Sequence, residues 1–256
     1  DLHSFPTRRS SDLHIGEREE CEAALEENRQ RLRELQYKMY ADRRFGMLAV
    51  LQGIDGGGKD GTIRNVFNAF NPQGCSVSSF KRPSELELRH DYLWRVHAHV
   101  PPRGEIGVFN RSHYEDVLVV RVENLVPKPV WSQRYAQIND FERLLAENDI
   151  RIAKFFLHIS KQEQKERFEV RLADRRKQWK FDPADLEKRA KWNDYRAAFE
   201  DAINRCTTTL APWYLVPADR KWFRNFAVSQ IMLYELEQLP LRFPKPDFDP
   251  ETIRIR

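Results

Sequence analysis

Clustered cysteines, long apolar runs and a large net charge are all missing from this 256-residue sequence. The cysteines Cys21, Cys75 and Cys206 lie far apart, which argues against a metal-ligand spacing or a disulfide framework and favours a reducing, cytoplasmic environment. No apolar stretch approaches the length of a membrane span, so we expect no membrane partner. The net charge of +4 gives no reason to expect nucleic acid as a partner. The seven histidines show no metal spacing, and no Ser-His-Asp order stands out.

The first 13 residues, Asp1–Leu13, differ in character from the rest of the chain. They show neither the apolar core of a signal peptide nor a helical period. The segment resembles the in-frame translation of a DNA-sequencing adapter, so we expect it to be non-native, with a disordered tail as the alternative. Beyond it the sequence predicts an N-terminal helix within residues 14–46, a main domain over residues 47–240 and an extended tail over residues 241–256.

The main domain opens with the most informative stretch, Met47–Thr62, which reads MLAVLQGIDGGGKDGT. Its apolar start predicts a buried parallel strand, and a helical pattern follows its end. Between them, Gly53-x4-Gly58-Lys59 matches the loop that cradles phosphates, because glycines let backbone amides approach phosphate oxygens and the lysine adds a full positive charge. A tight glycine turn without a ligand is the alternative interpretation.

Two acids set this loop apart from the usual motif. Asp60 stands where Ser or Thr normally offers a hydroxyl to Mg²⁺, and Thr62 comes two positions later. Asp55 lies inside the loop and can replace that hydroxyl as the metal ligand; the alternative is a side chain that stabilises the turn.

Strand and helix patterns alternate along the main domain, which predicts an α/β fold with a five-stranded, mostly parallel sheet flanked by helices. Capping boxes are predicted where Ser84 is followed by Glu87 and where Ser160 is followed by Glu163. The expected strands are Met47–Leu51, Ser76–Phe80, Glu105–Asn110, Ile150–Ile159 and Trp213–Pro217, and the expected helices include Glu17–Asp42, Thr62–Phe70, Ser84–His99, Val130–Asn148 and Lys221–Leu239.

Polar residues follow the third predicted strand at the end where ligands bind in open parallel sheets. Asn110 stands where a second acidic metal ligand is usual, and Glu115 and Asp116 can supply the missing charge or be ordinary surface acids. Arg111 suits phosphate oxygens through its planar fork, with an internal salt bridge as the alternative.

A basic run over residues 167–183 predicts a lid that closes over phosphates, although a solvated basic helix face is the alternative. Arg167, Arg171 and Arg175 recur every four residues, so they are expected on one helix face, and Trp179-Lys180 follow. Lys81 and Arg82, with Arg95 and Arg103, extend a positive strip that would suit a long polyanion.

Several blocks of the sequence together resemble the family-2 polyphosphate kinases, in particular the subgroup that acts on nucleoside mono- and diphosphates. The resemblance spans roughly residues 25–246. The blocks are IDGGGKDGT at 54–62, NPQGCSVSSFKRPS at 71–84, GEIGVFNRSHYEDVLVVRV at 104–122, FFLHISKQEQKERF at 155–168 and APWYLVPADRKWFRN at 211–225.

This resemblance implies a thymidylate-kinase-like phosphate-loop kinase fold with a helical lid, and Mg²⁺-dependent phosphoryl transfer between inorganic polyphosphate and AMP or ADP, giving ADP or ATP. Mn²⁺ is the alternative metal, guanine nucleotides are further candidate substrates, and a homo-oligomer is expected. The family loop is similar to GxDxxGKxG, so Asp60 falls at a variable position. Many relatives carry Asp where Asn110 stands, which shifts metal binding towards Asp55, Glu115 and Asp116.

The predicted site can be stated by role. An ATP-dependent nucleoside monophosphate kinase and a non-catalytic polyphosphate-binding module remain the competing interpretations. We expect catalysis from Asp55, Lys59, Arg111 and Asp116; phosphate binding by Gly56, Gly57, Gly58, Lys59, Asp60, Gly61, Thr62, Lys81, Arg82, Arg111, Arg171 and Lys180; nucleotide binding by Asn110, Glu115, Asp116 and Arg171; and metal binding by Asp55, Asn110 and Glu115.

Overall fold

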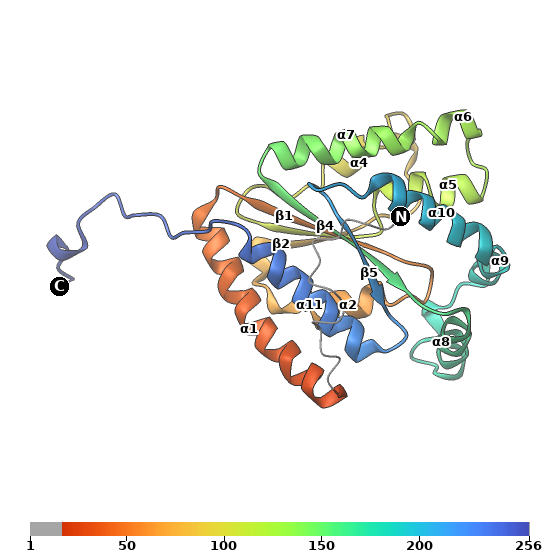
Figure 1. The fold of residues 1–256 in the computed structure, drawn as a ribbon, viewed down its shortest axis with the longest axis horizontal. Coiled ribbons are helices and arrows are strands. Elements are labelled where there is room, and N and C mark those ends of the chain that lie inside the picture. The colour runs from red at the N-terminus through yellow and green to blue at the C-terminus, as the bar shows by residue number, and fades with distance from the viewer. Residues whose placement is uncertain (1–16, 256) are drawn as a thin grey trace.

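A five-stranded parallel sheet forms the centre of the molecule in the computed structural model, which describes residues 17–255 (Figure 1). The strand order is β2-β3-β1-β4-β5, and every neighbouring pair is parallel, so the predicted sheet is confirmed and contains no antiparallel strand. The strands are β1 Gly46–Gln52, β2 Cys75–Ser79, β3 Ile106–Asn110, β4 Ile150–His158 and β5 Trp213–Pro217.

Helices cover both faces of the sheet (Figure 1). Alternate residues of β1 point to opposite faces. Met47 and its alternates pack with α1 (Arg18–Asp42) and α11 (Lys221–Glu237), whereas Leu48 and Val50 join the core under α7 (Arg134–Glu147) and α10 (Trp192–Cys206). The remaining helices are α2 Lys59–Asn65, α3 Glu85–Leu88, α4 Trp94–His97, α5 Val119–Val122, α6 Lys128–Trp131, α8 Lys161–Ala173 and α9 Ala184–Ala190, with 3₁₀ turns at Phe67–Ala69, Pro72–Gly74, His113–Asp116, Gln178–Lys180 and Pro250–Thr252.

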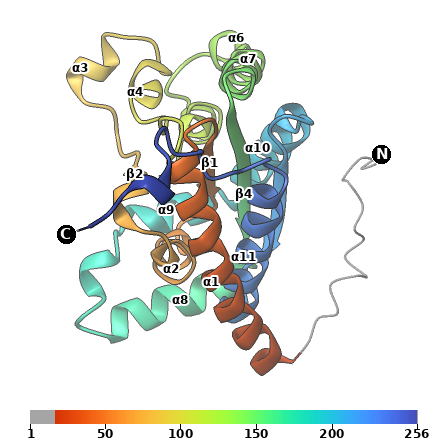
Figure 2. The same cartoon turned by 90° about the vertical axis from the view of Figure 1, so that its left-hand side faces the viewer.

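The N-terminal helix belongs to the main body. In Figure 2, α1 lies lengthwise beside α11, and Asn28 on α1 donates a buried hydrogen bond of 3.0 Å to the hydroxyl of Ser229 on α11. The predicted helix is confirmed, whereas the proposed adapter segment Asp1–Leu13 lies outside the described residues. At the other end, the amide of Arg242 still donates to Asp42 and the ring of Phe243 lies against Tyr37, and the chain beyond them leaves the body as an arm (Figure 1).

Three predicted helices are shorter than expected. The capping box of Ser84 and Glu87 is confirmed, but α3 ends at Leu88 and α4 starts anew at Trp94, because the carboxylate of Asp91 accepts hydrogen bonds from the amides of residues 93 and 94. The predicted helix Val130–Asn148 is divided into α6 and α7, and the one predicted over Thr62–Phe70 runs from Lys59 to Asn65 and continues as a 3₁₀ turn.

The basic segment also departs from a single helix. Ser160 caps α8 as predicted, but Glu163 does not complete the box, since its carboxylate binds Arg167 and the amide of Ser160 donates to Asp219. Helix α8 ends at Ala173, so Arg175 does not continue the row of Arg167 and Arg171. The following turn is held by Asp174, whose carboxylate accepts from the amide of residue 176.

Candidate active site

The phosphate loop connects the carboxyl end of β1 to α2, as the sequence predicted. Gly56 and Gly58 adopt positive φ angles of 86° and 101°, which side-chain-bearing residues rarely take. The amide of Gly57 donates a hydrogen bond of 2.8 Å to the carbonyl of Ile54, which closes a turn. The hydroxyl of Thr62 donates to the carbonyl of Gly58 at 3.2 Å, so in this state it is engaged within the helix.

Lys59 points back into its own loop. Its side chain is buried, and Nζ donates to the carbonyl of Gly53 at 2.6 Å and to that of Ile54 at 3.4 Å. Burial lowers the pKa of Lys59 to about 8, with the neighbouring Arg111 acting in the same direction. The ammonium is therefore held at the loop by weak acceptors, and the oxygens of a bound phosphate would be stronger ones.

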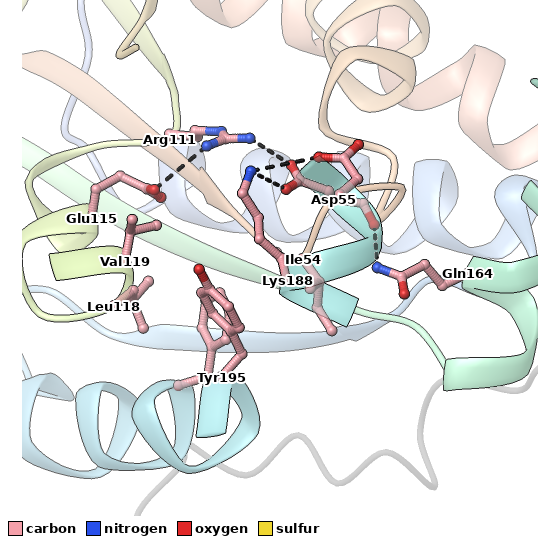
Figure 3. A pocket seen from close by; sticks show the side chains of 12 residues that line it. Ile54, Asp55, Arg111, Glu115, Leu118, Val119, Gln164, Lys188 and Tyr195 are labelled. Carbon is pink, nitrogen blue, oxygen red and sulfur yellow. Dashed lines mark hydrogen bonds and ion pairs between the residues drawn. The ribbon is translucent and has the colours of Figure 1, made fainter. Parts of the chain in front are cut away.

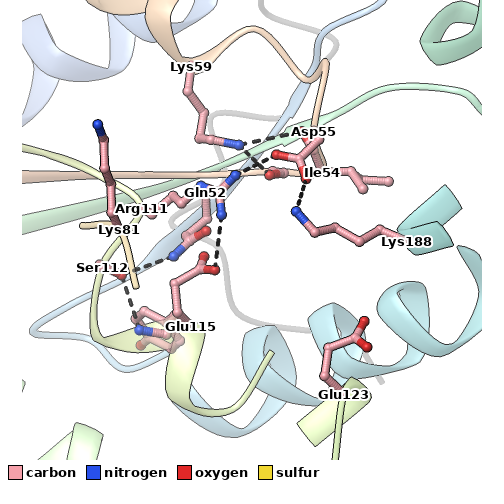
Figure 4. A network of polar contacts seen from close by, with 12 residues as sticks. Gln52, Ile54, Asp55, Lys59, Lys81, Arg111, Ser112, Glu115, Glu123 and Lys188 are labelled. Carbon is pink, nitrogen blue, oxygen red and sulfur yellow. Dashed lines mark hydrogen bonds and ion pairs between the residues drawn. The ribbon is translucent and has the colours of Figure 1, made fainter. Parts of the chain in front are cut away.

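Asp55 is the centre of the ion network at this edge of the sheet (Figures 3 and 4). Its Oδ1 accepts from Arg111 at 2.5 Å, and its Oδ2 accepts from Lys188 on α9 at 3.0 Å. Burial would raise the pKa of Asp55, but Arg111, Lys59 and Lys188 together hold it well below its ordinary value. The carboxylate is thus ionised at neutral pH and surrounded by cations from three separate elements.

Arg111 reaches Asp55 from a strained backbone position. Parallel pairing sets Leu51 of β1 beside Asn110 of β3, and the next residue turns with a φ of 63°, in the left-handed region. Its amide donates to the carbonyl of Leu51 at 3.0 Å, and its guanidinium lies 3.6 Å from the carboxylate of Glu115. This geometry directs Arg111 back towards Asp55 in the phosphate loop. Residues with strained backbone angles are commonly found at functional sites.

A cavity opens beside Asp55 between the phosphate loop and the helices α9 and α10 (Figure 3). Charged groups gather at one end of it and apolar or aromatic side chains at the other, a combination that suits a small ligand with a charged and a flat part. The cavity is lined by Gly53, Ile54, Asp55, Arg111, Glu115, Leu118, Val119, Gln164, Asp185, Lys188, Tyr195 and Phe199.

Some of the predicted site residues lie near this cavity without lining it. The amide of Asn110 donates to the carboxylate of Asp60 at 2.8 Å and so ties β3 to α2. Asp116 faces Arg134 on α7 instead, at 2.8 Å, and burial raises its pKa to about 6. Asp116 is therefore engaged on the α7 side of its turn, away from the contacts of Asp55.

The predicted phosphate-binding cations outside the loop do not line the cavity either. Lys81 and Arg82 are exposed at the end of β2, and the carbonyl of Lys81 is held by Arg95 at 2.9 Å. Arg171 lies over the ring of Phe168 at 5.4 Å, and Lys180 lies over the ring of Trp179 at 5.0 Å. Their assignment stays a prediction.

Four polar cavity residues were missed by the sequence analysis. Gln164 donates to the carbonyl of Asp55 at 2.7 Å, and Lys188 lies 3.5 Å from the carboxylate of Asp185. Burial, followed by the charge of Asp55, raises the pKa of Asp185 to about 6. The fourth is Tyr195. In sequence they resemble ordinary helix residues, and only the packing of α8, α9 and α10 against the phosphate loop brings them here.

The oxygen ligands at the loop fit a divalent cation that is held mainly by phosphate. Among residues 17–255, no three His, Cys, Asp or Glu side chains are grouped so as to hold a metal ion by themselves. Asp55 supplies a hard carboxylate next to the phosphate loop, and Mg²⁺ bound to phosphates characteristically takes one or two such ligands. Kinase-type phosphoryl transfer generally requires a divalent metal, and Asp55 is placed to contribute to it.

The sheet order, the phosphate loop and the arginine facing it define a phosphate-loop kinase fold. More specifically, the chain belongs to the polyphosphate kinase 2 family, because the model of that family matches residues 16–243. Membership makes the protein a phosphotransferase. Within residues 17–255, no helix is long and apolar enough to cross a membrane.

Known proteins agree with this placement. The chain is 50% identical over 255 residues to an AMP/ADP-polyphosphate phosphotransferase of Meiothermus ruber, covering 100% of this chain and 95% of that protein. It is 43% identical to an ADP-polyphosphate phosphotransferase of Rhodopseudomonas palustris, covering 96% and 88%. The crystal structure of Polyphosphate Kinase 2 from Arthrobacter aurescens TC1 superposes with a TM-score of 0.90 at 42% identity, covering 92% of this chain and 85% of that one.

Proposed function

We propose that this protein transfers phosphoryl groups between inorganic polyphosphate and AMP or ADP, producing ADP or ATP. The observation that carries the proposal is the meeting of Lys59, Asp55 and Arg111 at the phosphate loop, beside a cavity that has a charged end and an aromatic end. The names of the similar proteins from M. ruber and R. palustris support the same substrates.

The proposed mechanism needs no strong general base. The attacking atom is a nucleotide phosphate oxygen, which is already ionised at neutral pH. Catalysis then depends on alignment of two phosphate groups and on cations that neutralise the charge of the moving phosphoryl group. Lys59 and Arg111 supply those cations, and the lid segment with Arg171 and Lys180 adds charge when it closes over the chain.

Metal binding at this site is assigned to Asp55, with Glu115 as a second carboxylate and Asn110 as a neutral ligand. Mg²⁺ is the expected ion and Mn²⁺ the alternative; when bound, it neutralises and orients the phosphates. Because Asp55 is paired with Arg111 and Lys188, entry of a cation requires one of these ion pairs to open. The catalytic and nucleotide-binding roles of Asp116 stay a prediction, and its carboxylate pairs with Arg134.

The test is a donor and acceptor comparison with the purified full chain. Polyphosphate or ATP is offered as donor, AMP, ADP or GMP as acceptor, and the products are resolved with Mg²⁺, with Mn²⁺ and after removal of metal by EDTA. Transfer from polyphosphate that stops with EDTA is expected. Transfer from ATP alone would instead indicate a nucleoside monophosphate kinase. Polyphosphate binding without turnover would indicate a binding module.

The proposal extends to the compartment and the assembly of the enzyme. The wide spacing of Cys21, Cys75 and Cys206 along the chain supports a reducing compartment, which we take to be the cytoplasm. A homo-oligomer remains part of the proposal, and light scattering of the purified protein would measure its mass.

A further inference from the structure

A second buried cation lies against the phosphate loop, outside the lining of the cavity. Arg224, near the start of α11, is only 3% exposed. A Cβ atom placed on Gly58 would lie 2.0 Å from its Nη1, and one placed on Gly61 would lie 3.0 Å from its Nη2. The guanidinium therefore spans the two glycines that flank Lys59. It does not line the cavity that contains Asp55.

The charge of Arg224 is not balanced by any neighbour in the described part of the chain. Within residues 17–255 no carboxylate pairs with it, and its hydrogen bonds, from Nε and Nη2, both go to the amide oxygen of Asn225, at 3.2 and 2.8 Å. Burial lowers the pKa of Arg224 to about 10, and the nearby Arg167 adds to this. The group is still charged at neutral pH, so a buried positive charge stands beside the loop without an anion, an arrangement that is unfavourable until one binds.

The neighbouring Arg167 differs from Arg224, because its guanidinium has several acceptors and an acidic partner. Arg167 on α8 donates to the carbonyl of Gly56 at 2.8 Å and to those of Ala218 and Asp219, and it pairs with Glu163 at 2.7 Å. Its donors are used to fasten α8 and the turn after β5 to the phosphate loop. Arg224 lies beside it with Nη1 against Gly58 and no such acceptor.

We propose that Arg224 binds the phosphate oxygens of polyphosphate at the loop, with Asn225 orienting its guanidinium. The assignment rests on the proposed function and deepens it, because it names a residue for the polyphosphate chain that is separate from the residues lining the cavity. The aromatic end of the cavity, with Tyr195 and Phe199, suits a nucleoside, whereas the side of Arg224 presents cations to the loop glycines. Burial does not oppose the assignment, since Lys59, the expected phosphate ligand, is itself 8% exposed.

The experiment compares steady-state constants of the wild type, Arg224→Gln and Arg224→Lys. Loss of a charge-assisted contact predicts that KM for polyphosphate rises roughly tenfold or more in Arg224→Gln, while KM for AMP or ADP changes by less than about twofold. Arg224→Lys, which keeps the charge but not the fork, should fall in between. Arg143→Gln, an exposed arginine of α7, is the matched control for loss of one charge and should leave both constants unchanged.

Two outcomes overturn the assignment while leaving the proposed function intact. One is an unchanged KM for polyphosphate in folded Arg224→Gln. The other is an equal rise of both KM values together with a lower melting temperature, which indicates packing only. No polyphosphate-dependent transfer by the wild type would instead overturn the proposed function itself.

Should Arg224→Gln fail to fold, the wild type answers the question by NMR. The ¹⁵N resonance of the Arg224 Nε–H group, assigned with Arg224→Lys, should shift when tripolyphosphate is added. Binding of tripolyphosphate by calorimetry without that shift would contradict the proposal.

Discussion

Two clusters of charged side chains meet at the segment 110–116, and they differ in how completely their charges are used. On one side, Arg111 and Glu115 belong to the network of Asp55, which borders a cavity. On the other side, His113 and Tyr114 contact Glu142, which pairs with Lys154 in the core.

The core cluster is closed around Lys154, although Nδ1 of the buried His113 has no hydrogen-bond partner among residues 17–255. Lys154 is fully buried, and its ammonium donates to Glu142, to the hydroxyl of Tyr114 at 2.8 Å and to the carbonyl of Cys206 at 2.6 Å. Lys154 and His113 hold the pKa of Glu142 below its ordinary value against the opposing effect of burial. Every ammonium proton has a partner here. Asp55 is also paired, with Arg111 and Lys188, but its network borders a cavity. The closed cluster anchors the segment, and the open one borders the cavity at which we propose that phosphoryl transfer takes place.

The largest expected effect breaks the closed cluster. Lys154→Met leaves Glu142 buried without a counter-charge, which should lower the free energy of unfolding by about 3–5 kcal/mol. Urea unfolding measures this loss. The double variant Lys154→Met with Glu142→Leu removes both charges and should recover most of it. A single variant as stable as the wild type would show that the cluster does not anchor the fold.

The next effect breaks the open cluster without unfolding the protein. Lys59→Ala removes the loop ammonium, so kcat/KM should fall by about 10²–10³, while the melting temperature stays close to that of the wild type. Turnover from polyphosphate to ADP measures the loss. Lys128→Ala, an exposed lysine of α6, is the control. Undiminished turnover in folded Lys59→Ala would remove Lys59 from the proposed mechanism.

A smaller effect distinguishes two lysines on neighbouring turns. Lys188 pairs with Asp55 at the cavity, whereas Lys191 pairs with Glu123. Lys188→Met should lower kcat/KM roughly tenfold, because one cation beside the reacting phosphates is lost. Lys191→Met should leave it near the wild-type value. If both substitutions lowered kcat/KM equally, Lys188 would contribute only to the overall positive charge of this region and not through its position beside Asp55.

The smallest effect concerns pH and Asp116. Its pKa is raised to about 6, mainly by burial, so between the unfolded value of 3.8 and about 6 the folded state binds more protons than the unfolded state. This group therefore stabilises the protein fully below that window, and the contribution is lost as the pH rises through it. Relative to Asp116→Asn, the wild type should lose on the order of 1–2 kcal/mol between pH 4 and 7 in urea unfolding. If the free energies of unfolding of the wild type and Asp116→Asn differed by the same amount at every pH in that range, the raised pKa of Asp116 would be contradicted.

Local sequence patterns predicted the elements with a strong period or a specific turn. The five strands, the phosphate loop and the cap at Ser84 follow from apolar runs, glycine spacing and a short side chain that binds a nearby amide. The break at Asp91 was not predicted, because a carboxylate that competes for backbone amides leaves only a weak sequence signal. The position of Asp116 could not be predicted either, since a 3₁₀ turn decides which way each of its side chains points.

The sequence by itself determined that a glycine-rich loop with Lys59 follows a buried strand and that Arg111 comes directly after the neighbouring strand. Those features depend on neighbours in the chain and on the parallel order of strands. Tertiary structure alone decided that Lys188, Gln164 and Arg224, from three different helices, reach the same loop. Their convergence depends on how α8, α9 and α11 pack on the sheet, and helix packing at long range is not encoded in the spacing of any one segment.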